Sequence, residues 1–123
     1  MGEIIQAVCR ECGSQWDLRT GYGLLHGHKE AVIREFPPNM ERVLEGIYDN
    51  WEHVDFTFKQ AVCNKCHNYI AAATILEGGK PWITGTCPVC GGTGLKLSEE
   101  REKDICPRCE KGIIEIKKTG HWD

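Results

Sequence analysis

The 123-residue sequence predicts a small α+β fold in which β-hairpins carry paired cysteines and a helical segment is inserted between the first two pairs. Three observations lead to this prediction. All eight cysteines fall in Cys-x-x-Cys pairs, short alternating or β-branched runs flank the pairs, and one central stretch repeats its apolar residues with a helical period. The length corresponds to about one domain.

The runs that flank the cysteine pairs have the composition of β-strands. Val54, Phe56 and Phe58 alternate with polar residues, and this period of two is typical of a half-buried strand. Composition also predicts strands over residues 4–8, 15–19, 69–76, 82–86, 95–97 and 113–116. The charged residues 98–104 are expected to form a solvated connection.

Residues 27–52 are expected to form the helical insertion. A short helix over residues 28–36 should end at Pro37, because the residue before a proline disfavours the helical conformation. Asn39 is then expected to cap a second helix, whose apolar residues recur at helical spacing. These are Met40, Val43, Leu44, Ile47, Tyr48 and Trp51.

The cysteine pairs predict two metal centres. Two intervening residues let a tight turn direct both sulfurs at one metal, and two such turns supply the tetrahedral four-thiolate set that zinc accepts. We therefore expect two structural zinc ions, with no ligand position left for a substrate water. Iron is the alternative metal, since it also accepts an all-sulfur tetrahedral site. The expected ligands are Cys9, Cys12, Cys63, Cys66, Cys87, Cys90, Cys106 and Cys109.

Two ways of sharing the metals remain open. The sequential arrangement, which we favour because the last two pairs resemble neighbouring Gly/Pro-rich repeats, joins Cys9/Cys12 to Cys63/Cys66 and Cys87/Cys90 to Cys106/Cys109. It divides the chain into a zinc unit with the helical insertion, residues 1–66, and a second zinc-binding hairpin unit, residues 67–123, packed as one compact chain. The rival arrangement joins Cys63/Cys66 to Cys87/Cys90 and leaves the terminal pairs to meet.

Residues that tolerate a positive φ lie just beyond several pairs. Gly13 and Gly91 directly follow a second cysteine, and Asn68 lies two residues after Cys66. Such residues suit turns whose backbone N–H groups point at sulfur. His67 is a candidate for a hydrogen bond to a sulfur, because metal ligands often have such partners.

Hairpins that each present a Cys-x-x-Cys pair to a shared zinc resemble the zinc-ribbon fold group, whose functions are diverse. Within residues 87–112, Cys87-Pro-Val-Cys-Gly-Gly-Thr-Gly94 resembles the Cys-x-x-Cys-x-Gly-x-Gly repeat of the DnaJ-type chaperone cysteine-rich region. The second copy departs from this repeat, with Lys111 where a glycine belongs, and His53-Val-Asp55 has valine where a J-domain has proline. This resemblance implies a zinc hairpin and no full co-chaperone. A looser resemblance connects the chain to small uncharacterised bacterial zinc-ribbon proteins.

Charge argues against nucleic acid as the partner. The net charge is −3, and residues 28–59 contain seven acidic and four basic residues. Nucleic-acid binding usually requires a basic stripe, whereas Lys117 and Lys118 form only a weak patch. We therefore expect a module that binds another protein. A nucleic-acid-binding zinc ribbon and a thiol-redox or zinc-responsive protein are the alternatives.

No catalytic constellation is visible in the sequence, and no enzymatic activity is expected. A thioredoxin-type redox protein needs one reactive pair beside a βαβ pattern, which is not found here. Many cysteines in metal-binding spacing fit a reducing compartment, so a cytoplasmic location is expected. No apolar run reaches the ~20 residues that span a membrane, and the oligomeric state is not predicted.

Three further side chains are assigned from their sequence context. His26 and His28 lie near a glycine-rich loop and are expected at the surface. Trp122, close to the C-terminus, is expected to be exposed and to suit a contact surface.

Overall fold

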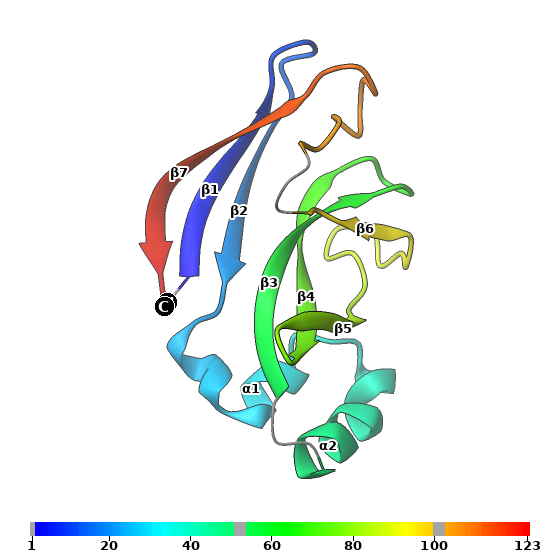
Figure 1. The fold of residues 1–123 in the computed structure, drawn as a ribbon. Helices are drawn as coiled ribbons and strands as arrows, with labels where there is room; N and C mark the ends of the chain where they lie inside the picture. Colours follow the sequence, from blue (N-terminus) through cyan, green and yellow to red (C-terminus); the bar gives the residue numbers. More distant parts are fainter. Residues whose placement is uncertain (1, 51–53, 100–102) are drawn as a thin grey trace.

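The computed structural model describes residues 2–50, 54–99 and 103–123 and consists mostly of antiparallel β-sheet (Figure 1). Within these residues seven strands form one sheet in the order β5-β4-β3-β2-β1-β7, and β6 pairs with β3. With its two short helices the fold is α+β. The strands are β1 (Gly2–Cys9), β2 (Gln15–Gly21), β3 (Val54–Cys63), β4 (Tyr69–Glu77), β5 (Lys80–Thr84), β6 (Leu95–Leu97) and β7 (Ile114–Trp122).

The helical insertion lies between β2 and β3, as predicted. It contains α1 (Lys29–Ile33) and α2 (Glu41–Asn50), together with 3₁₀ turns at Leu24–Gly27 and Pro38–Met40. Both helices lie at one end of the sheet, near β3, β4 and β5 (Figure 1). Apolar residues of the insertion and of the sheet form one core cluster, which contains Val32, Phe36, Leu44, Ile47, Phe56, Ala73 and Ile75.

Two details of the insertion differ from the prediction. Asn39 does not cap α2, because it lies inside the 3₁₀ turn Pro38–Met40 that leads directly into the helix. Leu44 and Ile47 are buried, whereas Val43 is 57% exposed, so the buried face of α2 is narrower than expected. Trp51, expected on the same face, lies outside the described residues.

The sheet consists of two halves that are joined at one point. β1 pairs along its length with both β2 and β7, and β3 pairs with β4 over nine residues. Between the halves, β2 and β3 share only the pair Gly21–Phe58. Side chains of the two halves also pack together near the cysteine-bearing turns, where the ring centroids of Trp16 in β2 and Tyr69 in β4 lie 6.1 Å apart.

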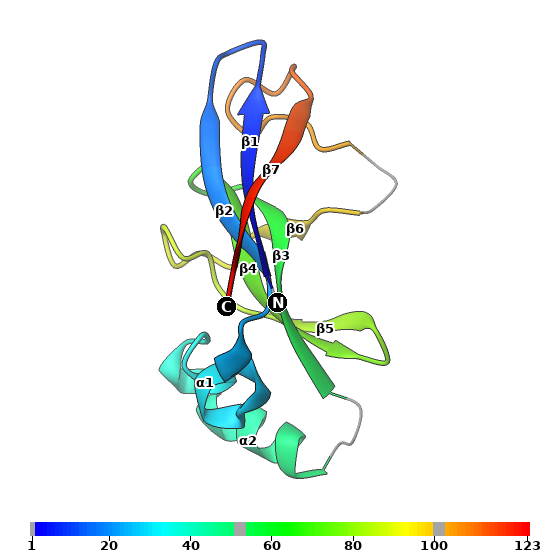
Figure 2. The same cartoon turned by 90° about the vertical axis from the view of Figure 1, so that its left-hand side faces the viewer.

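The C-terminal strand is longer than the predicted residues 113–116, because β7 pairs with β1 from Cys9–Ile114 to Gly2–Trp122. This pairing places the two ends of the chain side by side (Figure 2). Trp122 is therefore not an exposed contact residue, and its Nε1 donates a hydrogen bond to the Thr20 carbonyl at 3.0 Å. A Cβ at position 2 would lie 2.2 Å from Trp122 Nε1, so only glycine leaves room for the indole.

His26 is also buried more deeply than predicted, with only 8% of its side chain exposed. Its ring lies 4.5 Å from that of Phe56, and its Nδ1 accepts a hydrogen bond from the Gly23 N–H at 2.9 Å. His28, the other histidine of this segment, is exposed as expected. His26 therefore has a packing role in the turn that follows β2.

Candidate metal centres

The four Cys-x-x-Cys pairs form turns of one type, which we call knuckles. In each knuckle the residue after the second cysteine donates its backbone N–H to the carbonyl of the first cysteine, over 2.8–3.0 Å. That residue also has a positive φ, between 58° and 77°. These residues are Gly13, His67, Gly91 and Glu110. Glycine marks only two of the four, so the other two knuckles carry a strained backbone that their sequence does not reveal.

A second backbone hydrogen bond closes each knuckle. The first cysteine of three knuckles donates its N–H to the carbonyl five residues later, at Ser14, Asn68 or Gly92. The fourth knuckle is one residue longer, since Cys106 donates to Gly112. A Cβ at position 112 would lie 2.4 Å from Cys9 Sγ, so this glycine lets the fourth knuckle approach the first.

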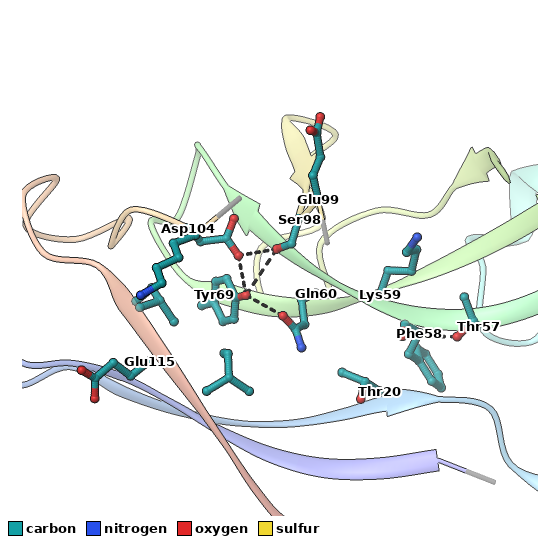
Figure 3. A pocket seen from close by; sticks show the side chains of 13 residues that line it. Thr20, Thr57, Phe58, Lys59, Gln60, Tyr69, Ser98, Glu99, Asp104 and Glu115 are labelled. Carbon is teal, nitrogen blue, oxygen red and sulfur yellow. Dashed lines mark hydrogen bonds between the residues drawn. The ribbon is translucent and has the colours of Figure 1, made fainter. Parts of the chain in front are cut away.

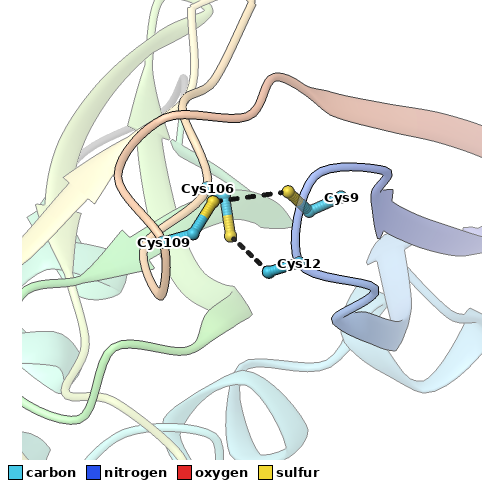
Figure 4. A group of neighbouring side chains, drawn as sticks. All are labelled: Cys9, Cys12, Cys106 and Cys109. Carbon is cyan, nitrogen blue, oxygen red and sulfur yellow. Dashed lines mark hydrogen bonds between the residues drawn. The ribbon is translucent and has the colours of Figure 1, made fainter.

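The knuckles meet in two groups of four cysteines. Cys9, Cys12, Cys106 and Cys109 form the terminal cluster (Figure 4). Cys63, Cys66, Cys87 and Cys90 form the central cluster. Within each cluster all Sγ atoms lie within 4.8 Å of one another, so each is placed to hold one metal ion.

The sulfur spacing fits a tetrahedral metal. Contacts between knuckles are 3.6 and 3.7 Å in the terminal cluster, and 3.6 and 3.7 Å in the central cluster. A tetrahedron with the usual Zn–S distance of about 2.3 Å has sulfur atoms about 3.8 Å apart. These contacts match the sulfur spacing of a tetrahedral zinc site, and four cysteine sulfurs are a donor set that zinc accepts.

The sequential arrangement favoured from the sequence is wrong, and the rival arrangement is the one observed. The reason is strand pairing, which places Ile114 opposite Cys9 and Leu95 opposite Cys63. β7 thus brings the fourth knuckle to the first, and β6 brings the third to the second. Cysteine spacing alone does not distinguish the two arrangements, because every pair has the same local geometry.

The two clusters share one construction. In each, a strand ends at the first cysteine of a knuckle, a hairpin partner follows, and a later knuckle is followed by a strand that returns to the first. The terminal cluster uses β1, β2 and β7, and the central cluster uses β3, β4 and β6. Each cluster joins one pair from residues 1–66 to one from residues 67–123.

The terminal cluster contains thiols with opposite pKa shifts. Hydrogen bonds from the Ser14 side chain and backbone lower the pKa of the exposed Cys12 to about 6. At Cys9 the Cys12 N–H lowers the pKa, but burial and the Cys109 and Cys106 sulfurs outweigh it and raise the pKa to about 11. Without a cation, these shifts favour the thiolate at Cys12 and the neutral thiol at Cys9.

The central cluster shows the same division. Burial opposes ionisation of Cys63, but the Cys66 and Lys65 N–H groups prevail and lower its pKa to about 6. Burial raises the pKa of Cys87 to about 11. A divalent metal would supply the positive charge that keeps all four sulfurs as thiolates.

Backbone and side-chain donors surround the sulfurs. The Gly92 N–H donates to Cys90 Sγ at 3.4 Å, and the Gly112 N–H donates to Cys109 Sγ at 3.3 Å. The side chain that donates to Cys66 is Asn68, through Nδ2 at 3.4 Å, whereas the expected candidate His67 is exposed. The sequence marks Asn68 only as a turn residue and gives no signal for this role.

A polar hollow of about 780 Å³ lies beside the terminal cluster, between β3 and β7 (Figure 3). At one side the Tyr69 hydroxyl donates to Asp104 Oδ2 at 2.6 Å, and Ser98 Oγ donates to the same oxygen at 2.5 Å. The Asp104 carbonyl accepts the Ile114 N–H at 2.9 Å. These bonds hold the segment that leads into Cys106 and so help to position the fourth knuckle.

Comparison with known proteins identifies no relative of this chain. No family model, curated protein or solved structure matches the chain. The cysteine clusters are compatible with a zinc-ribbon-like protein, and no related protein supports the local likeness of residues 87–112 to DnaJ-type repeats. Among the described helices, none is both long and apolar enough to cross a membrane.

Proposed function

We propose that each cysteine cluster holds a zinc ion and that the two ions stabilise the fold. The observation that supports this proposal most strongly is the gathering of eight cysteines into two closed groups of four, each with sulfurs within 4.8 Å of one another. Zinc accepts such a set without redox chemistry, and a complete thiolate set leaves no ligand position for substrate. The role of the metals is therefore structural.

The terminal cluster has the larger effect on the chain in this proposal. Its contacts join residues 100 and 94 positions apart, namely Cys9 to Cys109 and Cys12 to Cys106. Binding of zinc by four cysteines contributes a free energy of order 10 kcal/mol in small zinc domains. Zinc would therefore hold β7 and β1 together at the end of the sheet that carries the knuckles.

The zinc-stabilised chain serves, in our proposal, to bind another protein. Ile105 and Ile113 face each other across a β-bridge beside the fourth knuckle and are 59% and 51% exposed. Exposed apolar side chains of this kind are more useful in a protein contact than toward nucleic acid. The net charge of −3 also disfavours a polyanionic partner.

Elemental analysis combined with a thiol count tests the zinc proposal. Purified protein is expected to contain two zinc ions per chain, and its eight thiols should react slowly in the native protein and completely only after denaturation with chelator. Chelation should abolish the native circular dichroism and the cooperative thermal transition. A metal-free protein that keeps both, or one with a readily oxidised cysteine pair, would replace the structural role with a thiol-redox role.

A further inference from the structure

We propose that Asn68 couples the two clusters, so that a metal ion bound in one raises the affinity of the other. This inference rests on the zinc proposal and goes beyond it. Asn68 is the residue through which the terminal and central clusters are linked by hydrogen bonds among the described residues. Its side-chain oxygen faces groups from the terminal cluster, and its side-chain nitrogen faces a sulfur of the central cluster.

The Asn68 side-chain oxygen accepts two hydrogen bonds from residues next to the terminal cluster. Arg108, which lies within the fourth knuckle beside Cys109, donates through Nη2 to Asn68 Oδ1 at 2.9 Å. Trp16, at the start of β2 beyond the first knuckle, donates through Nε1 to the same oxygen at 3.1 Å. The Arg108 guanidinium lies 5.1 Å from the Trp16 ring centroid, so the two donors also support each other.

The Asn68 side-chain nitrogen contacts the central cluster. Asn68 Nδ2 donates to Cys66 Sγ at 3.4 Å, and the Asn68 carbonyl closes the second knuckle by accepting the Cys63 N–H at 3.0 Å. The orientation of the amide follows from chemistry. Arginine and the indole N–H only donate, so they require the oxygen, and the NH₂ group is left for the sulfur.

The coupling arises because both metal ions order the same three side chains, Trp16, Arg108 and Asn68, and the loss of conformational entropy occurs only once. A metal in the terminal cluster fixes the first and fourth knuckles and therefore positions Trp16 and Arg108. These donors then hold the Asn68 amide with its N–H toward Cys66, which favours the thiolate that the second metal requires. The protein then loses less conformational entropy when the second metal ion binds than when the first does, so the binding of the two ions is positively cooperative. Thermodynamic reciprocity requires the same factor in the opposite direction.

Arg108 offers the test that least disturbs the fold, because its side chain is exposed. R108A removes the charged one of the two donors to Asn68 Oδ1, and it leaves the Trp16 donor and the Asn68–Cys66 hydrogen bond in place. The matched control is R10A. Arg10 occupies the first knuckle of the same cluster, pairs with Glu115 at 2.9 Å and is 80% exposed, so its loss changes charge without touching Asn68.

The experiment is a zinc titration of the metal-free full chain against a competing chelator, followed by native mass spectrometry of the zero-, one- and two-zinc species. In wild type and R10A the one-zinc species should be scarce. In R108A its proportion should rise about fivefold or more, in line with usual coupling factors. N68A should give the same rise and also weaken the central cluster about tenfold.

The outcomes separate the coupling from the zinc proposal. Two bound zinc ions, with the same one-zinc population in R108A, N68A and R10A, would overturn the coupling and leave the zinc proposal intact. A wild-type chain that takes up no zinc would overturn both. A rise in R108A that R10A matches would assign the effect to net charge and would also overturn a role for Asn68.

Discussion

The residue after the second cysteine adopts the same left-handed backbone in all four knuckles, although its side chain differs. Gly13 and Gly91 adopt this conformation without penalty, whereas His67 and Glu110 have φ near 58° and 59° and a Cβ that disfavours it. The latter two knuckles therefore store strain in the folded state. Their geometry is maintained by the adjacent backbone hydrogen bond to the first cysteine.

Glycine at either strained position should stabilise the protein. We expect E110G and H67G each to raise the free energy of unfolding of the metal-loaded protein by up to about 1 kcal/mol, through relief of the left-handed strain. G91A should lower it by about 1 kcal/mol, because a Cβ at this φ of 74° is strained although nothing lies within 4 Å.

The control for these substitutions is G94A, since Gly94 also has open space around its Cβ position but no positive φ. Chemical denaturation at fixed free zinc measures all four variants. Equal effects of G91A and G94A would show that the positive φ does not matter.

The raised pKa of Tyr69 predicts that the free energy of unfolding falls at alkaline pH. Burial, and next its hydrogen bond to Asp104, raise the pKa of Tyr69 in the folded protein well above the unfolded value of about 10. The folded state then keeps a proton that the unfolded state loses. Stability from this group is complete below pH 10 and falls as pH rises further.

Y69F should lower the free energy of unfolding by about 1–2 kcal/mol near neutral pH, because the substitution removes the hydroxyl group that donates to Asp104. Above pH 10 the free energies of unfolding of Y69F and wild type should converge. Denaturation curves measured from pH 8 to 11 test this prediction, and a constant difference over that range would contradict it.

At the scale of elements, β7 determines which knuckles meet, and Trp122 secures its end. The indole packs over Gly2 and Gly23, lies 5.8 Å from the Phe58 ring, and donates to the Thr20 carbonyl. These contacts connect the last strand to β1, β2 and β3. Loss of the indole should loosen the C-terminal end of β7.

We expect W122A to lower the free energy of unfolding by about 2–3 kcal/mol, somewhat less than a fully buried aromatic truncation, because Trp122 is only half-buried. Hydrogen exchange should accelerate in the β1–β7 pair. L24A is the control, because Leu24 is 75% exposed and should change stability by less than about 0.5 kcal/mol. Similar losses in both variants would refute the proposed role of Trp122.

The positions of the strands were predictable, but their pairing was not. Alternation and β-branching are local signals, so residues 54–59 and 95–97 were recognised from their own composition. The pairing of β7 with β1 joins segments at opposite ends of the chain, and no local pattern encodes it. For the same reason, local spacing predicts all eight cysteines as candidate ligands, whereas the grouping favoured from the sequence is wrong.

Side-chain hydrogen bonds across the fold were also beyond local patterns. Asn68, Arg108 and Trp16 are far apart in sequence and come together only because the two halves of the sheet meet near the knuckles. Their neighbours in sequence predict His26 and Trp122 at the surface, whereas contacts in the fold bury the His26 side chain and half-bury Trp122. Such assignments depend on tertiary packing.

Across the whole molecule, the segment that forms the central cluster is inserted in sequence between the two segments that form the terminal cluster. The terminal cluster uses strands from both ends of the chain, and the strands of the central cluster lie between them in sequence. Both clusters contribute cysteines to apolar cores, with Cys9 and Cys106 in one and Cys63 and Cys87 in the other. A metal ion bound in either cluster would therefore also stabilise the adjacent apolar core.

The two clusters should differ in reactivity. Cys12 of the terminal cluster is exposed, whereas no cysteine of the central cluster is more than partly exposed. Limited alkylation of the metal-loaded protein should label Cys12 first and the buried Cys63 and Cys87 last. Peptide mass spectrometry gives the order, and early labelling of Cys63 or Cys87 would contradict the observed burial.

Cadmium-113 NMR of the cadmium-substituted protein would identify which cysteines share a metal ion. We expect two cadmium signals, each in a range typical of four thiolates. One should correlate with the β-protons of Cys9, Cys12, Cys106 and Cys109, and the other with those of Cys63, Cys66, Cys87 and Cys90. A single signal, or one that links Cys9 and Cys63, would contradict this expectation.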